Sequence, residues 1–275
     1  MFHCAENLGK RGFECALYGF DAISDRASST RCASLYDCFI NSSAVILPLP
    51  LSKDGININS VGSKIRMCDV FSHCPEGVPV FAGSISEKAR AIAKEYNREI
   101  YDYFEDDTLT EKNAYATAEG AAMLLMQNSE KTVFGTRVLV CGYGRIGKYT
   151  ARILQSLGAK VTIFARREVS RVQAAIDGHC TLEPEKLYEK INTFDFIINT
   201  VPANIITQKE LSRMSSSQGY IELASKPFGI DKKLADSYNI EIIDGSALPS
   251  RYCPESAGGY IAEKLMCEFE RSGII

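Results

Sequence analysis

The chain has 275 residues, of which 45% are hydrophobic, and a formal net charge of −3 at pH 7. That length and apolar content suffice for two domains with separate cores. The nearly balanced charge argues against nucleic acid or a membrane surface as the main partner, and no apolar run approaches the roughly 18 residues of a membrane span.

The ten cysteines are scattered, with no Cys-x-x-Cys pair and no histidine nearby at metal-ligand spacing. This pattern is typical of reduced, mostly buried thiols in a cytoplasmic protein. We therefore expect no disulfide framework and no metal site.

The first hundred residues predict a small α/β domain, because short β-rich runs alternate with helical segments. In chain order we expect a helix over 4–11, strands over 12–20, 44–47 and 78–83, a helix capped by Ser84 or Ser86 that ends near Asn97, and a strand over 99–105 before an acidic turn at Asp106 and Asp107. Sheets of this kind normally open with a strand at the N-terminus, and Met1 leaves no room for one. We expect that first strand to be missing.

A helix over 117–127 is expected to cross between two domains, and strands and helices alternate after it. The strands are expected over 137–141, 160–165, 194–199, 219–223 and 240–243. The predicted fold is α/β, with two Rossmann-like domains built on doubly wound parallel sheets and joined by crossing helices. Their expected bounds are 1–113 and 114–250, and segment 251–275, with a helix from Pro254 to Arg271, is expected to pack back toward the N-terminal domain.

A glycine pattern between the first two strands of the second domain predicts a dinucleotide site. Gly142, Gly144 and Gly147 form Gly-x-Gly-x-x-Gly between a strand and a helix, with a second strand about twenty residues on. The three glycines permit a tight turn, close approach of a pyrophosphate and close helix–sheet packing. Because a helix N-terminus favours anions, the whole loop is expected to bind cofactor: Gly142, Tyr143, Gly144, Arg145, Ile146 and Gly147.

The end of the second strand predicts which dinucleotide is preferred. NAD-binding domains place an acid there to accept hydrogen bonds from the ribose 2′-OH, whereas this chain has Arg166 and Arg167. A guanidinium binds a 2′-phosphate that a carboxylate would repel. We expect NADP to be preferred over NAD; the alternative is that both arginines are solvated surface charges.

Ligands of open α/β sheets lie beyond the carboxyl ends of the strands, so the segments that follow the strands should form the rest of the site. Thr200, Val201, Pro202 and Ala224 are expected to contact the cofactor, and Asn199, Ser225 and Lys226 to be catalytic. Lys226 could bind a substrate carboxylate or transfer a proton. The alternatives are a strand-ending turn for Asn199 and a solvated loop position for Lys226.

Several motifs in this order resemble the family formed by the A subunit of dipicolinate synthase. They are NAYATAEGA, GYGRIG, INTVPANII, ELASKPFG and ALPSRYCPESAGGYIAE, and a looser match covers residues 19–21 and 46–50. The resemblance implies oxidation of dihydrodipicolinate or hydroxytetrahydrodipicolinate to dipicolinate with NADP during endospore formation. It also implies that the partner is a flavoprotein-like B subunit, in the mother-cell cytoplasm. A homo-oligomer is a further possible assembly.

A dicarboxylate substrate would need cations and N–H donors, and four residues are expected to contact it. They are Thr117, Glu119, Arg251 and Ser256. Glu119 either reaches the substrate or only favours the helix dipole. Ser256 follows Pro254, a residue suited to the first helical position, so its N–H can point at an anion. The family usually has lysine where Glu255 stands, and Arg251 is the expected substitute.

Two other functions fit parts of the sequence. A 2-hydroxyacid dehydrogenase needs a histidine acid–base, and no histidine follows residue 179. A non-catalytic NADP-binding sensor, or a scaffold for the B subunit, would retain the glycine loop and lack turnover. Turnover therefore separates this last hypothesis from a dehydrogenase.

Overall fold

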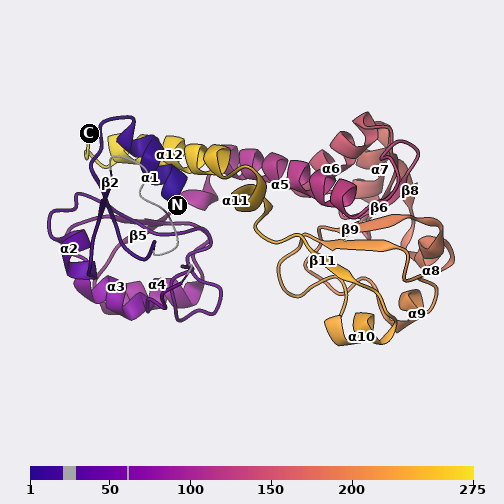
Figure 1. Ribbon diagram of the computed structural model, residues 1–275, viewed down its shortest axis with the longest axis horizontal. Helices are drawn as coiled ribbons and strands as arrows, with labels where there is room; N and C mark the ends of the chain where they lie inside the picture. Colours follow the sequence, from indigo (N-terminus) through magenta and orange to yellow (C-terminus); the bar gives the residue numbers. More distant parts are fainter. Residues whose placement is uncertain (21–28, 61) are drawn as a thin grey trace. The chain divides into compact units, whose positions relative to one another are not determined.

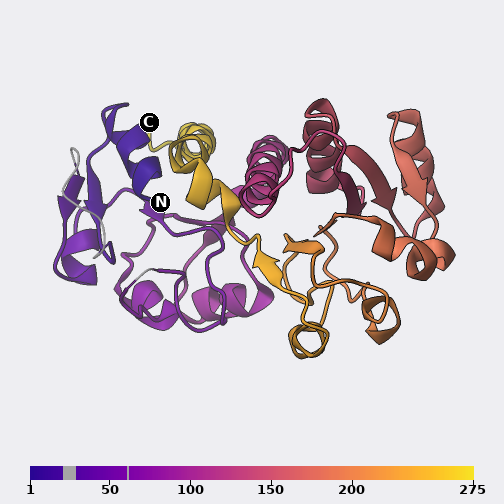
Figure 2. The same ribbon diagram turned by 45° about the vertical axis from the view of Figure 1, so that its right-hand side comes forward.

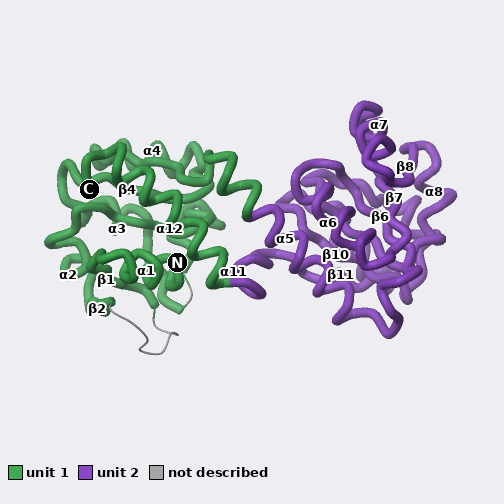
Figure 3. The backbone as a smooth tube through the Cα atoms, turned by 90° about the horizontal axis from the view of Figure 1, so that it is seen from above, with its two compact units in different colours: residues 1–112, 254–275 green, residues 113–253 purple. Residues whose placement is uncertain are grey.

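The computed structural model describes residues 1–20, 29–60 and 62–275, so Asp21 of the 19–21 motif lies outside the described residues. The chain forms two compact units, which Figure 3 colours separately. Unit 1 comprises Met1–Lys112 and Pro254–Ile275, and unit 2 comprises Asn113–Cys253. The last helix therefore belongs to the same unit as the N-terminal residues.

Unit 2 is built on a six-stranded sheet in which every neighbouring pair of strands is parallel. The strands are β6 (Arg137–Cys141), β7 (Lys160–Phe164), β8 (Cys180–Leu182), β9 (Phe196–Asn199), β10 (Gly219–Glu222) and β11 (Ile242–Asp244). Their order is β11-β10-β9-β6-β7-β8. Within unit 2 the chain enters the sheet at an inner strand, β6, and winds outward through β7 to β8. It then returns to β9, on the other side of β6, and winds in the opposite direction through β10 to β11. This order confirms the predicted Rossmann-like fold of the second domain.

Helices cover both faces of this sheet (Figure 1). One face carries the later turns of α5 (Asp107–Gln127) with α6 (Arg145–Ser156), α7 (Glu168–Ile176) and α11 (Leu248–Tyr252), and the other carries α8 (Leu187–Lys190), α9 (Gln208–Leu211) and α10 (Lys232–Ser237). Alternation along the strands explains this arrangement: Val138 and Val140 enter the first core, whereas Leu139 and Cys141 enter the second. Two 3₁₀ turns, at Pro184–Lys186 and Ile191–Thr193, complete the unit.

Unit 1 contains parallel strands in two smaller sheets. The strands β1 (Cys15–Leu17) and β2 (Ser29–Arg31) pair with each other, and β4 (Val80–Ala82) pairs with both β3 (Val45–Ile46) and β5 (Ile100–Asp102). The helices are α1 (Phe2–Gly9), α2 (Leu35–Phe39), α3 (Met67–His73), α4 (Glu87–Glu95) and α12 (Pro254–Arg271), with a 3₁₀ turn at Tyr103–Glu105. Figures 1 and 2 both show α12 lying beside α1.

Several boundaries differ from the sequence-based expectation for local reasons. The strand expected over 99–105 ends at Asp102, whose carboxylate accepts hydrogen bonds from the backbone N–H groups of Ser84, Ile85 and Phe104. The helix expected over 117–127 already begins at Asp107. Helix α4 is capped by Ser86, whose hydroxyl accepts from the Ala89 N–H, whereas Ser84 has a φ of 54°.

The cysteines are all free thiols, but only Cys4, Cys74 and Cys141 are buried, so the expectation of mostly buried thiols was wrong. In the described part of the chain, no helix is long and apolar enough to cross a membrane.

Close packing of α12 on α1 leads to a prediction about two adjacent glycines. A Cβ at Gly258 would lie 2.6 Å from both the backbone nitrogen of Cys4 and the Cβ of His3, whereas a Cβ at Gly259 would meet nothing closer than 3.8 Å. We expect Gly258→Ala to lower the free energy of unfolding by about 1–3 kcal/mol. Gly259→Ala should raise it by about 0.5–1 kcal/mol through helix propensity. Urea denaturation measures both, and equal effects would contradict the close approach of the helices.

Candidate nucleotide-binding site

The strand register of unit 2 aligns the last residues of all six strands. Direct pairings join Leu182 to Phe164, Phe164 to Cys141, Cys141 to Asn199, Asn199 to Glu222 and Glu222 to Asp244. Because the strands are parallel, the segment that follows each of them leaves the sheet at the same edge. The glycine loop, the arginines after β7 and the segments after β9 and β10 therefore emerge along one row.

The three glycines of the loop differ in what a Cβ at each position would meet. Gly142 has a φ of 99°, and a Cβ there would meet Thr200 Oγ1 and the Val201 side chain. A Cβ at Gly147 would meet the carbonyl oxygen of Gly142. A Cβ at Gly144 would meet no protein atom within 4 Å. Gly142 and Gly147 thus serve the packing of the turn, whereas Gly144 leaves open space beside the backbone.

Gly144 is the N-cap of α6, so the first N–H groups of this helix lie next to that open space. Orphan N–H groups and the helix dipole favour an anion at this position. Arg145 is exposed and Ile146 is half-buried. The loop therefore fits the pyrophosphate of a dinucleotide.

The side chain of Tyr143 is directed into the unit. It is buried, and its hydroxyl donates a hydrogen bond of 2.7 Å to Asp177 Oδ2. Burial is the larger cause that raises the pKa of Tyr143, and the hydrogen bond to Asp177 raises it further. Of the predicted loop residues, Tyr143 can thus serve the cofactor through its backbone, while its phenol anchors the loop.

Arginines surround the end of β7. Arg166 and Arg167 are exposed, and Arg167 is the N-cap residue of α7. One helical turn later, Arg171 Nη1 donates hydrogen bonds of 2.7 and 2.9 Å to the backbone carbonyls of Ala165 and Arg166. Arg171 was not among the predicted site residues, although its spacing of four from Arg167 places the two on the same side of a helix.

Asn199 and Glu222 form a buried polar pair at the ends of β9 and β10. Asn199 is 1% exposed and Glu222 is 5% exposed, and Asn199 Nδ2 donates a 2.7 Å hydrogen bond to Glu222 Oε1. Asn199 Nδ2 also donates a hydrogen bond to the Val201 carbonyl, and Asn199 Oδ1 accepts one from the Val201 N–H. Asn199 was expected to be catalytic, with a strand-ending turn as the alternative; in the structure it is buried and its amide shapes the turn after β9.

Glu222 was not among the predicted site residues. Burial raises its pKa, although hydrogen bonds from Asn199, Gly229, Ala224 and Tyr220 oppose that rise. All four neighbours are donors, which is the arrangement that an ionised carboxylate requires. Glu222 ends an apolar strand and begins the ELASKPFG motif, but the sequence does not show that it meets Asn199, because that contact depends on the register of β10 with β9.

The segment after β9 lies against the glycine loop. Thr200 Oγ1 donates a 2.8 Å hydrogen bond to the carbonyl of Cys141, the residue before Gly142. Val201 is half-buried and Pro202 is exposed. Ala224, after β10, is half-buried with its N–H bonded to Glu222. Thr200 and Val201 therefore border the cofactor loop directly.

Ser225 and Lys226 are both exposed in the loop after β10. The Lys226 ammonium lies 6.0 Å from the centroid of the Phe228 ring, within the range of a weak cation–π contact. Because both residues follow the last residue of β10, their exposed side chains lie at the carboxyl edge of the sheet, where a ligand can reach them.

The residues expected to contact substrate lie in different places. Thr117 is buried, and its hydroxyl bonds the Asn113 carbonyl of its own helix, whereas Glu119 is exposed on α5. Arg251 Nη1 donates to the carbonyls of Asp244 and Ser246, which places it beside the end of β11. Ser256 is an exposed residue in the first turn of α12, in unit 1.

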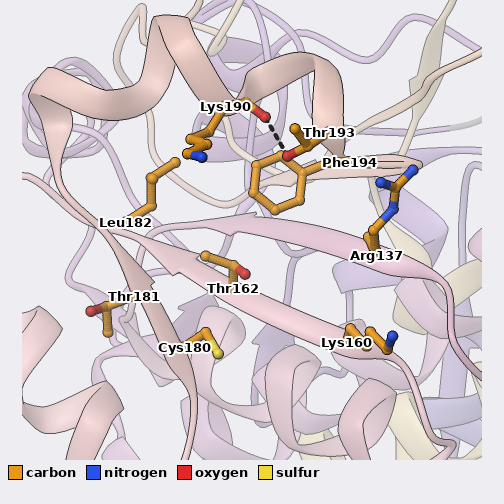
Figure 4. Close-up of a pocket in the computed structure, with 9 residues that line it drawn as sticks. All are labelled: Arg137, Lys160, Thr162, Cys180, Thr181, Leu182, Lys190, Thr193 and Phe194. Atoms are coloured by element: carbon orange, nitrogen blue, oxygen red, sulfur yellow. Dashed lines mark hydrogen bonds between the residues drawn. The ribbon is translucent and has the colours of Figure 1, made fainter.

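A pocket occurs at the opposite edge of the same sheet, around the first residues of β6, β7 and β8 (Figure 4). Its lining includes Arg137, Lys160 and Lys190. The Arg137 guanidinium is occupied by Asp195, with hydrogen bonds of 3.2 Å from both Nε and Nη2. This pocket therefore lies away from the glycine loop and is not part of the candidate site.

Comparison with known proteins agrees with this geometry. Residues 1–104 match the family described as the N-terminal domain of the dipicolinate synthase A subunit, and residues 113–241 match S-adenosyl-L-homocysteine hydrolase, NAD binding domain. The A subunit of dipicolinate synthase from Bacillus subtilis (strain 168) is 29% identical over 92% of this chain and 88% of its own length.

Solved structures give the same result. A crystal structure of the dipicolinate synthase A subunit from Bacillus halodurans has a TM-score of 0.81 at 26% identity, covering 97% of this chain and 93% of that one. The corresponding dipicolinate synthase structure from Bacillus subtilis has a TM-score of 0.80 at 26% identity, covering 99% and 93%. A transhydrogenase from Sinorhizobium meliloti shares the fold, with a TM-score of 0.73 at 16% identity and coverage of 98% and 88%.

The fold and the glycine loop define a Rossmann-type protein with a nicotinamide-dinucleotide-binding domain of the dehydrogenase kind. Within that class, the match of the N-terminal domain and the similarity along nearly the whole length single out one family. The resemblance that the motifs predicted is confirmed: the N-terminal residues match the N-terminal domain of the dipicolinate synthase A subunit, and the chain is similar to that subunit along nearly its whole length.

Proposed function

We propose that this chain is an NADP-dependent dehydrogenase that oxidises dihydrodipicolinate, or its hydroxytetrahydro precursor, to dipicolinate. The cluster of guanidinium groups at the end of β7 supports NADP, because Arg166 and Arg167 are exposed there and Arg171 adds a third positive charge nearby. The open space beside Gly144 fits a pyrophosphate. This combination is the observation that carries the proposal.

The reaction is a two-electron oxidation. Dihydrodipicolinate and NADP⁺ give dipicolinate, NADPH and one proton, and a bound nicotinamide would supply the hydride acceptor. The hydroxytetrahydro precursor must in addition lose one water molecule, which gives the dihydro compound. The protein must hold two carboxylates and accept the proton. Lys226, exposed at the strand edge, is the candidate for a carboxylate contact or proton transfer, with Ser225 beside it. Arg251 is the candidate for a second cation, since it is anchored beside the end of β11.

A turnover assay tests this function. The purified chain would be given dihydrodipicolinate, generated in place, and NADP⁺, with and without the B subunit, while NADPH absorbance is followed. We expect NADPH to form and Lys226→Ala to abolish most of it. Tight NADP binding without NADPH formation in either condition would instead identify a non-catalytic sensor or scaffold.

The relatives are named as one subunit of a synthase, which suggests the biological setting. By that relationship, the partner is a flavoprotein-like B subunit, and the setting is the mother-cell cytoplasm during endospore formation. Co-purification of the two proteins from sporulating cells tests this part of the proposal, and its failure would leave the activity assay unaffected.

A further inference from the structure

Both ends of the 224–229 loop, the segment that carries Ser225 and Lys226, are bonded to one side chain. Glu222 Oε1 accepts a 3.0 Å hydrogen bond from the Ala224 N–H, and Oε2 accepts a 2.8 Å bond from the Gly229 N–H. The two oxygens of one carboxylate thus hold the two ends of the loop. Between these ends, residues 225–228 are exposed.

Two further donors fix the carboxylate itself. Asn199 Nδ2 bonds Oε1 at 2.7 Å, and the Tyr220 hydroxyl bonds Oε2 at 3.1 Å. Tyr220 precedes Glu222 by two residues on the same strand, so both side chains point to the same face of the sheet. Each oxygen therefore has one side-chain donor and one loop donor, and the carboxylate has little freedom to rotate.

The far end of the loop fits closely against this arrangement. A Cβ at Gly229 would collide with the Asn199 amide and the Tyr220 hydroxyl. The Gly229 carbonyl also accepts hydrogen bonds from the N–H groups of Ile205 and Ile206, at 2.8 and 2.9 Å. Only a glycine allows the backbone to come this near to the Asn199 amide and the Tyr220 hydroxyl.

We propose that Glu222 is a positioning residue, which holds Ser225 and Lys226 at the carboxyl edge of the sheet by binding both ends of the 224–229 loop. The catalytic part of this inference rests on the proposed function, because it assigns the loop a part in turnover. Glu222 itself is 5% exposed and acts through the loop backbone.

Glu222→Gln is the direct test, because a glutamine has one acceptor oxygen and one amino group in place of two acceptor oxygens. It can hold only one end of the loop. We expect the N–H of Ala224 or of Gly229 to exchange with solvent deuterium about 10- to 100-fold faster, as measured by NMR on the full chain without ligand. In the wild type, both amides should be protected.

Two control variants separate positioning from general damage. Glu210→Gln changes another buried glutamate of the same unit, which is 8% exposed and bonds Thr207 in the capping box of α9. Tyr220→Phe removes one side-chain donor and leaves both loop bonds in place. Glu210→Gln should not change exchange at Ala224 or Gly229, and Tyr220→Phe should change it less than Glu222→Gln does. If Glu222→Gln does not fold, unprotected Ala224 and Gly229 amides in the wild type would still overturn the proposal.

Turnover supplies the second readout. Glu222→Gln should lower kcat for dihydrodipicolinate oxidation at least about tenfold, while the affinity for 2′-phospho-adenosine fragments of the cofactor stays constant. Faster exchange with unchanged kcat and KM would overturn the positioning role. Faster exchange in a chain whose wild type shows no turnover would refute the proposed function and leave the structural contact between Glu222 and the loop established.

Discussion

The double variant Arg166→Ala, Arg167→Ala should lose about ten- to a hundredfold in affinity for NADPH, with little change in affinity for NADH. A charge-assisted contact to the 2′-phosphate contributes about 1.5–3 kcal/mol, and the unphosphorylated ribose offers no such contact. Both side chains are exposed, so their removal should not disturb the core. Calorimetric titration of the two reduced dinucleotides measures the change in preference.

Arg152→Ala is the matched control, because Arg152 is an exposed arginine of the same unit that lies on α6, away from the end of β7. It should leave the ratio of the two affinities unchanged. The salt dependence gives a second check: raising the ionic strength should weaken NADPH binding to the wild type more than to the double variant. An unaltered preference in the double variant would mean that the two arginines are only solvated surface charges.

Gly144→Ala should mainly weaken dinucleotide binding, whereas Gly147→Ala should mainly lower the stability of the fold. Gly144→Ala places a methyl group where no protein atom lies within 4 Å and where φ is −83°, so the fold should lose about 1 kcal/mol or less. The same methyl group occupies the space beside the helix N-terminus. We expect dinucleotide affinity to fall at least about tenfold, because the pyrophosphate can no longer approach the N–H groups closely.

Gly147→Ala instead directs its methyl group at the carbonyl of Gly142, within the protein. It should lower the free energy of unfolding by about 1–3 kcal/mol, which corresponds to a fall in Tm of several degrees. Thermal unfolding and cofactor titration on both variants separate the two effects. If Gly144→Ala bound NADPH as the wild type does, the pyrophosphate would have to lie elsewhere.

The sequence predicted a strand or a turn well where neighbouring residues by themselves favour that conformation. The hydrophobic run over 137–141 predicted a strand and the glycines after it predicted the loop; the structure adds that Val138 and Val140 enter one core whereas Leu139 and Cys141 enter the other. Boundaries set by side-chain capping were less accessible: the carboxylate of Asp102, which ends β5, bonds the distant N–H groups of Ser84 and Ile85. The short edge strand β8 (Cys180–Leu182) also has too few residues for a periodic pattern.

The sequence by itself therefore determined the parallel α/β fold, the glycine loop and the cations that follow β7, since each depends on residues close together in the chain. Only the tertiary structure decided which polar groups meet. Asn199 and Glu222 are 23 residues apart and become neighbours through the register of β9 with β10. The sequence did predict that the last helix packs back toward the N-terminal residues, but only the structure shows that α1 is its neighbour and that the two helices meet closely at Gly258.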